Sequence, residues 1–333
     1  MKILFLTVDR KNVVTKHWGW IHDALKRHAE VNMIEVDLGG YKAGQFARKV
    51  CRREIFVEPI IESIQKKYDF ILTDANFAFQ DEPWSEIKTP RGMIIQDLHY
   101  NRENPQENPY LMVEIAKKQH WDIIFHRFKY PIMEWFPELA ETSKLVWMPH
   151  CIDFNVFNDW GLDKKYDVLM SGWHFPEYYP YRNKAHEMLK DCDFYTEIER
   201  PPETGQKDNT RWPVADEFSK VLNQSKICIT DGLKHNYVIL KYYEMAASRT
   251  CIFSNWFDEL ADVGFEPNKN MVVMDFDNLK GQIQWWLEND KERERISSNA
   301  YDLIVSRHAA DLRAKELLKT CEDFVNENSS FES

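Results

Sequence analysis

The sequence predicts an α/β protein with two domains, each built on a parallel sheet. Short apolar segments alternate with helical patterns along most of the 333 residues, as they do where helices connect parallel strands. The alternation restarts after a connecting segment at 149–165, and the chain is longer than one hydrophobic core usually serves. We therefore expect domains at 1–155 and 156–310, followed by a helical segment at 311–333.

Six segments in the first half have the apolar character of buried strands. They lie at 2–8, 31–37, 68–74, 92–96, 121–126 and 144–148. Helical patterns separate them, one at 17–28 and a long polar one that ends near residue 66. Strands that are apolar along their whole length are typical of parallel sheets with both faces covered by helices.

The second half repeats this pattern. Strands are expected at 166–172, 194–198, 225–230, 249–254 and 270–276. A helix is expected at 181–191, a second in the stretch that opens with Tyr237, and only helices after about residue 278. The polar, proline-rich segment 199–213 predicts a loop.

Composition excludes several classes of function. The formal net charge of −11, without a dense Lys/Arg block, argues against general nucleic-acid binding. No apolar run reaches the roughly eighteen residues of a transmembrane span. The six cysteines are scattered and form no CxxC pair, which is typical of reduced thiols, so we expect a cytoplasmic protein.

Common nucleotide-binding and hydrolase motifs are absent from the sequence. Neither GxGxxG, nor GxxxxGK[ST], nor GxSxG follows any expected strand. This disfavours NAD-dependent dehydrogenases, P-loop NTPases and α/β-hydrolases. Because open parallel sheets bind ligands at the carboxyl ends of their strands, polar residues that follow strands are the candidate site residues.

Four segments together resemble a known family. They are WMPHCIDFNVF (147–157), YDVLMSGWHFPEYYPYR (166–182), ILKYYEMAASRTCIFSN (239–255) and WWLENDKERERISSNAYDLIVSRHAADLRAKELL (285–318). They resemble GT-B-fold glycosyltransferases, and in particular the spore-maturation-protein branch of the retaining, nucleotide-sugar-dependent enzymes. The resemblance implies a GT-B fold, in which two Rossmann-like domains with parallel sheets face one another across a cleft and the C-terminal helix crosses back to the N-terminal domain.

The same resemblance implies a reaction. A sugar would pass from a nucleoside-diphosphate sugar, bound mainly by the second domain, to an acceptor hydroxyl on the side of the first domain. The resemblance implies that the anomeric configuration is retained and that neither a metal nor another cofactor takes part. A glycan, a lipid-linked precursor, a protein and a modified nucleobase all remain open as acceptors.

Lys241 and Glu244 are the central candidates. They lie three residues apart and hence on one face of the expected helix, where the ordinary alternative is a solvated surface pair. By resemblance, the Glu244 carboxylate would accept hydrogen bonds from the donor ribose hydroxyls. Lys241 and Arg182 would stabilise the charge that develops on the departing diphosphate, with a merely exposed side chain as the alternative for Arg182.

Three further residues are expected at the donor. Backbone N–H groups near Asn236 and Tyr237, at the expected helix start, would contact the diphosphate. Gly172, directly after a strand, would let the backbone approach the donor closely. Many retaining enzymes of this superfamily carry a second glutamate with seven residues between the two, and here that position is Asn236, which bears no charge.

In the first domain, Asp97 and His99 follow the strand expected at 92–96. They are expected to contact the acceptor hydroxyl or the transferred sugar, and a polar loop without this role is the alternative. Trp18 and Gly19 are expected at the acceptor or cleft, with packing between the domains as the alternative for the tryptophan. The Asp-x-Asp pattern at 275–277 resembles a metal motif of a different fold, so no metal site is predicted.

Two other functions stay open. A non-catalytic GT-B-like chain that binds a nucleotide or glycan would also fit the absence of the first glutamate. A non-hydrolysing sugar-nucleotide epimerase would need carboxylates and histidines converging from both domains.

Overall fold

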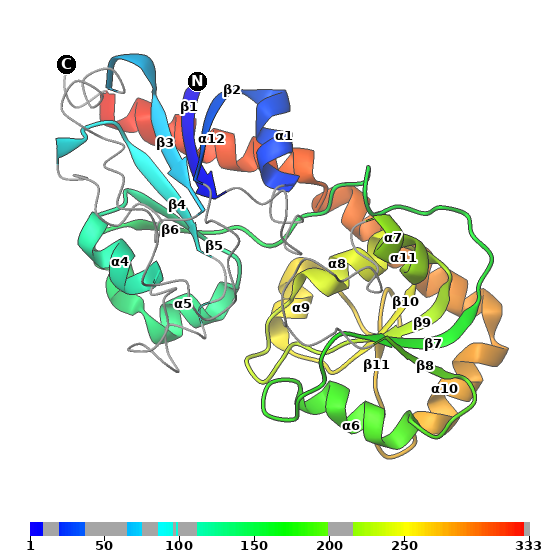
Figure 1. Ribbon diagram of the computed structural model, residues 1–333. Coiled ribbons are helices and arrows are strands. Elements are labelled where there is room, and N and C mark those ends of the chain that lie inside the picture. The colour runs from blue at the N-terminus through cyan, green and yellow to red at the C-terminus, as the bar shows by residue number, and fades with distance from the viewer. Residues whose placement is uncertain are drawn as a thin grey trace. The chain divides into compact units, whose positions relative to one another are not determined.

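The computed structural model describes residues 1–8, 20–36, 65–74, 86–95, 98, 112–198 and 216–329. The chain forms two compact units, one with Met1–Pro149 and Asp311–Ser333, the other with His150–Pro202 and Lys207–Ala310. Each unit contains a sheet whose strands are all parallel, with helices on its faces (Figure 1). The predicted α/β fold class is therefore confirmed.

The first unit holds a six-stranded sheet in the order β2-β1-β3-β4-β5-β6. Its strands are β1 (Lys2–Val8), β2 (Glu30–Val36), β3 (Phe70–Thr73), β4 (Arg91–Ile95), β5 (Ile123–His126) and β6 (Lys144–Trp147). All six lie close to their predicted limits. The side chains of β3, β4 and β5 are buried at every position, as expected for strands covered on both faces.

Helices cover both faces of this sheet (Figure 1). They are α1 (Trp20–His28), α4 (Met112–Gln119), α5 (Lys129–Trp135), the 3₁₀ helix η5 (Pro137–Glu141) and α12 (Ala310–Ser329). Val113, Ile132 and Leu139, from α4, α5 and η5, share one core with strand residues. On α12, Asp311 accepts hydrogen bonds from Arg27 at 2.9 Å and His28 at 2.7 Å, which joins this helix to α1. The long helix predicted to end near 66 lies outside the described residues, except for 65–67.

The second unit holds a five-stranded sheet in the order β11-β10-β9-β7-β8. Its strands are β7 (Tyr166–Ser171), β8 (Tyr195–Ile198), β9 (Ser225–Ile229), β10 (Cys251–Ser254) and β11 (Val272–Val273). The last strand is shorter than predicted because the chain turns soon after it, where the Asp275 carboxylate accepts a hydrogen bond from the N–H of Asp277 at 3.0 Å. The predicted loop at 199–213 lies outside the described residues.

The helices of this unit are α6 (Pro180–Leu189), α7 (Asp216–Asn223), α8 (Leu240–Ala247), α9 (Asp258–Val263), α10 (Leu279–Glu288) and α11 (Asp290–Arg307). α6 and α10 cover one face of the sheet, whereas α7, α8 and α11 lie on the other (Figure 1). Ala185 of α6 and Ile283 of α10 share a core with Val168, Met170 and other strand residues. Alternate residues of each strand therefore serve the two faces.

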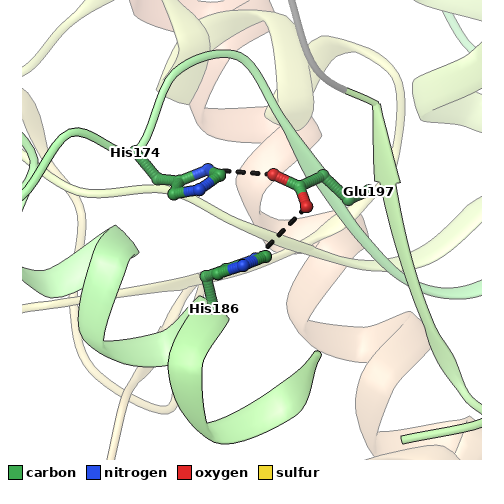
Figure 2. Close-up of side chains that lie close together, drawn as sticks. All are labelled: His174, His186 and Glu197. Atoms are coloured by element: carbon green, nitrogen blue, oxygen red, sulfur yellow. Dashed lines mark ion pairs between the residues drawn. The ribbon is translucent and has the colours of Figure 1, made fainter. Parts of the chain in front are cut away.

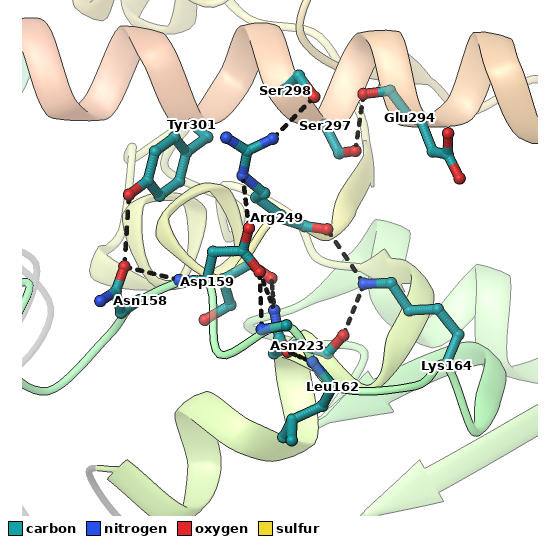
Figure 3. Close-up of polar contacts among 12 residues, drawn as sticks. Asn158, Asp159, Leu162, Lys164, Asn223, Arg249, Glu294, Ser297, Ser298 and Tyr301 are labelled. Carbon is teal, nitrogen blue, oxygen red and sulfur yellow. Dashed lines mark hydrogen bonds and ion pairs between the residues drawn. The ribbon is translucent and has the colours of Figure 1, made fainter.

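The segment 158–164 is held to the second unit by a polar network (Figure 3). Asn223 is the centre of this network: its side chain accepts a hydrogen bond from the N–H of Leu162 at 3.0 Å and donates to Asp159 at 3.1 Å. Lys164 donates to the Asn223 carbonyl at 2.6 Å, and Arg249 pairs with Asp159 at 2.9 Å. These contacts explain why the segment belongs to the second unit although it has no helix or strand.

Two findings bear on the environment of the protein. Within the described part of the chain, no helix has both the length and the apolar character that crossing a membrane requires. The five cysteines that the structure describes form no disulfide bond with one another. A cytoplasmic location stays a prediction.

Candidate functional site

Three of the residues predicted for the donor site lie together at the carboxyl end of β7. Gly172, which directly follows this strand, has a φ of +87°, a conformation that L side chains rarely adopt. A Cβ atom there would lie 2.9 Å from Nζ of Lys241 and 3.6 Å from Nη1 of Arg182. The structure therefore brings Gly172, Lys241 and Arg182 together, and only glycine leaves room for the ammonium group.

Lys241 is held against the end of β7. Its Nζ donates to the Ser171 carbonyl oxygen at 2.5 Å and to the Ser171 hydroxyl at 3.2 Å. Burial lowers the pKa of Lys241, and the nearby Arg182 lowers it further, whereas Glu244 raises it. An ammonium group has three donors, so two bonds to Ser171 leave one proton for a ligand.

Glu244 is buried on the same helix, with 9% of its surface exposed. Burial raises its pKa, and Lys241 opposes this effect. Its carboxylate makes no hydrogen bond or ion pair with any residue that the structure describes. Buried carboxylates are costly unless they are partnered, and the Glu244 carboxylate has the capacity to accept hydrogen bonds from a ligand. The alternative of a solvated Lys–Glu surface pair is wrong.

Arg182 is almost fully buried, with 2% exposure, because it packs under the end of the sheet. Its Nη1 donates to the Trp173 carbonyl at 2.7 Å, and its Nη2 donates to the Thr230 hydroxyl at 3.2 Å. Nη2 also pairs with Asp231 at 3.4 Å. The alternative of an exposed side chain is wrong. Arg182 holds the chain after β7 in place and adds positive charge beside Lys241.

The expected helix start near Asn236 and Tyr237 is wrong, because α8 begins at Leu240. The N–H of Asn236 instead bonds the Leu233 carbonyl at 3.4 Å, and that of Tyr237 bonds the Gly232 carbonyl at 2.7 Å. Asn236 is exposed and adopts a φ of +56°, which asparagine tolerates better than most residues. Both residues lie in a turn before the helix, so these two N–H groups are not held for an anion.

The remaining predicted residues, Trp18, Gly19, Asp97 and His99, lie outside the described residues. The structure instead shows a buried cluster at the carboxyl ends of β1 and β3. The Asp74 carboxylate accepts a hydrogen bond from Thr7 at 2.7 Å and lies 3.0 Å from Nε2 of His22. Asp74 is the last residue of the strand predicted at 68–74, so its position alone was a signal.

Two other features were missed from the sequence. Asp231, the partner of Arg182, lies two residues after β9, so it also follows the end of a strand. His174, His186 and Glu197 form a cluster that could hold a metal ion, with donor atoms within 4.8 Å of one another (Figure 2). These three residues lie on three different segments, and no motif links them.

One family model matches part of the chain. Residues 184–319 match the model of a family described as glycosyl transferase-like. The match confirms the enzyme class predicted from the sequence, a glycosyltransferase, at the level of the family model. No curated protein matches the chain.

Solved structures share the fold. Sucrose-phosphate synthase from Thermosynechococcus elongatus aligns over 98% of this chain and 100% of its own, with a TM-score of 0.63 and 10% identity. HepE from Anabaena, solved with UDP and glucose, aligns over 97% and 100%, with a TM-score of 0.59 and 12% identity. A glycosyltransferase from Rickettsia africae aligns over 98% and 99%, with a TM-score of 0.55 and 9% identity. The predicted GT-B fold is confirmed, and identities this low establish the fold alone.

Proposed function

We propose that this chain transfers a sugar from a nucleoside-diphosphate sugar to an acceptor hydroxyl. One observation carries the proposal: Glu244 is buried beside Lys241 at the carboxyl end of a parallel sheet, and its carboxylate has no partner among the described residues. A ribose diol fits this carboxylate, because one anionic acceptor can bond both hydroxyl groups. HepE, which shares the fold, was solved in complex with UDP-glucose, so this donor is the first to test.

In this proposal Lys241 stabilises the leaving diphosphate. Its remaining proton and its charge face the position that Gly172 leaves open, where the backbone can approach the phosphates. Arg182 is a positioning residue, because its guanidinium is bonded to Trp173 and Thr230, while its charge adds to the local field. Preorganised positive charge at a departing group is usually the largest catalytic contribution.

The finer assignments follow from the resemblance of the motifs. We propose that transfer retains the anomeric configuration, that no metal takes part in it, and that the chain belongs to the spore-maturation branch and acts in the cytoplasm. We propose that the two substrates bind to different domains, one at 1–155 and the other at 156–310. The helical segment 311–333 is proposed to return to the first domain. The first would bind the acceptor, through Asp97 and His99 and near Trp18 and Gly19, and the second the donor.

The test is a calorimetric titration with UDP, GDP, dTDP, ADP and CMP and their common sugar conjugates. One nucleotide is expected to bind selectively, and Glu244→Gln is expected to weaken it by roughly 10- to 100-fold, since a hydrogen bond to a charged group contributes about 1.5–3 kcal/mol. Glu187→Gln is the matched control, because Glu187 is exposed and pairs with Lys190 on the surface.

Equal affinities for wild type and Glu244→Gln would overturn the role given to this residue. The transferase proposal would be overturned if the wild-type protein bound none of these nucleotides or sugar conjugates. Binding without release of the diphosphate, in the presence of candidate acceptors, would favour the non-catalytic alternative, which the uncharged Asn236 also fits.

A further inference from the structure

Two histidines and a glutamate converge beside the donor residues of the second unit. His174 lies just after β7, His186 on α6 and Glu197 on β8 (Figure 2). Nδ1 of His174 is 2.9 Å from one carboxylate oxygen of Glu197, and Nδ1 of His186 is 3.2 Å from the other. One carboxylate therefore lies between two imidazole rings that come from separate segments of the chain.

The arrangement of the rings is unusual for simple ion pairs. The two imidazoles stack, with their centroids 4.1 Å apart and an angle of 17° between their planes. The Nδ1 atoms of both histidines approach the two oxygens of one carboxylate, and two imidazoles with a carboxylate are a ligand set that one metal ion can share.

The contact between His174 and Glu197 does not have the geometry of a hydrogen bond. Nδ1 of His174 and Oε1 of Glu197 are both buried atoms, and neither has a hydrogen-bond partner within the described part of the chain, although they are 2.9 Å apart. Buried donors and acceptors are normally satisfied, so each such exception calls for an explanation. Lone pairs that point at a common ion explain it.

The distances suit a tetrahedral metal ion. With metal–ligand bonds of about 2.0–2.2 Å, ligand atoms lie roughly 3.3–3.6 Å apart. One donor atom from each of the three residues lies within 4.8 Å of the others, so small side-chain rotations bring all three to one ion. Two imidazoles and a carboxylate are ligands that zinc accepts, with a fourth position left for water.

We propose that His174, His186 and Glu197 bind a divalent transition-metal ion, with zinc as the first candidate. The ion would tie the start of the β7–α6 connection to both α6 and β8. This connection carries the site: His174 is two residues after Gly172, and His186 is one helical turn after Arg182. The metal is a structural brace, separate from the transfer reaction, and goes beyond the function proposed above.

The test is a calorimetric titration of the chelator-stripped full chain with zinc chloride. One zinc ion is expected to bind per chain, and Co²⁺ is expected to give the absorption bands of a tetrahedral site. His186→Ala removes a ligand and is expected to weaken zinc binding by more than about 100-fold, since loss of a group that only supports a ligand already costs 10- to 100-fold. Glu197→Gln, which preserves the shape of the side chain, is expected to have a comparable effect.

A control variant makes the result specific. His120→Asn removes an exposed histidine of the first unit, in a left-handed conformation that asparagine adopts readily, and is expected to change nothing.

The inference is overturned if the wild-type chain binds no stoichiometric zinc, or if Glu197→Gln and His186→Ala bind it as tightly as wild type. Circular dichroism of the stripped variants checks that they are folded, and Glu197→Gln alone decides the question if His186→Ala is not. The nucleotide titration in the presence of chelator tests the proposed function separately, since its outcome depends on Glu244 and not on zinc.

Discussion

Two charged clusters of the second unit differ in how completely their groups are partnered. In the network that holds 158–164, Asp159 bonds Asn223 and pairs with Arg249, and Lys164 donates to two carbonyls (Figure 3). Around α8, the buried Glu244 carboxylate makes no hydrogen bond or ion pair with any residue that the structure describes.

This difference distinguishes a cluster that stabilises the fold from one that binds a ligand. A cluster that only stabilises the fold satisfies its polar groups internally, because each unsatisfied buried group costs free energy. A cluster that binds a ligand leaves some groups for it and stays less stable until the ligand arrives. The comparison predicts opposite outcomes for substitutions in the two places.

The largest effect is expected for Lys241→Met, which removes the cation at the proposed diphosphate site. The rate of nucleoside-diphosphate release from the preferred donor should fall roughly 10²- to 10³-fold, as when a single stabilising donor is removed from other active sites. The control is Lys164→Met in the satisfied network, which should lower stability and leave this rate unchanged. The proposed difference between the two clusters would be contradicted if both variants stayed stable and the rate of nucleoside-diphosphate release fell equally in both.

Asn223→Ala should be the most destabilising change in the satisfied network. It removes the acceptor of the Leu162 N–H and the donor to the Ser248 carbonyl, which lies 3.1 Å away. Each buried group left unpaired costs about 1–3 kcal/mol, so the free energy of unfolding, measured by urea denaturation, should fall by that order. Nucleotide affinity should stay at the wild-type value, and a clear loss of affinity would contradict the division between the clusters.

Gly172→Ala tests the space beside Lys241. The positive φ should cost about 1–2 kcal/mol of stability. The new Cβ should also displace the ammonium group, which lies 2.9 Å from it, and weaken donor binding. Gly161→Ala is a matched control, because Gly161 has a φ of +62° and no atom within 4 Å of its Cβ position. Equal donor affinity in the two variants would show that this space is not used.

The smallest effect is a pH dependence of stability at Glu244. Because burial raises its pKa, the folded state binds more protons than the unfolded state above the ordinary value of 4.5. The wild type therefore loses stability from this group as pH rises through that window. The Glu244→Gln variant has no carboxyl group that must ionise in a buried position. Its free energy of unfolding, compared with that of the wild type, should therefore increase between pH 5 and pH 8. A difference that stays constant over this range would mean that the carboxylate is not held in a buried environment.

Much of the fold was visible in the sequence because its signals are local. Apolar runs such as 123–126 and 166–171 are buried strands, and both parallel sheets follow from their alternation with helices. The motifs also named Gly172, Arg182, Lys241 and Glu244, since each follows a strand or lies on a helix between two strands. The helix start was misplaced because the turn at 232–239 depends on its own hydrogen bonds and not on an apolar period.

The sequence by itself determined the α/β class and the two parallel sheets, and its motifs named Gly172, Arg182 and Lys241, which meet at the end of β7. Only the tertiary structure decided how their charges are used: Arg182 is bonded to groups 48 and 49 positions away, Glu244 has no partner among the described residues, and His174, His186 and Glu197 meet. The physical reason is range. Hydrophobic periodicity is set by neighbours along the chain, whereas the partners of a buried charge depend on strand order, which places distant residues side by side.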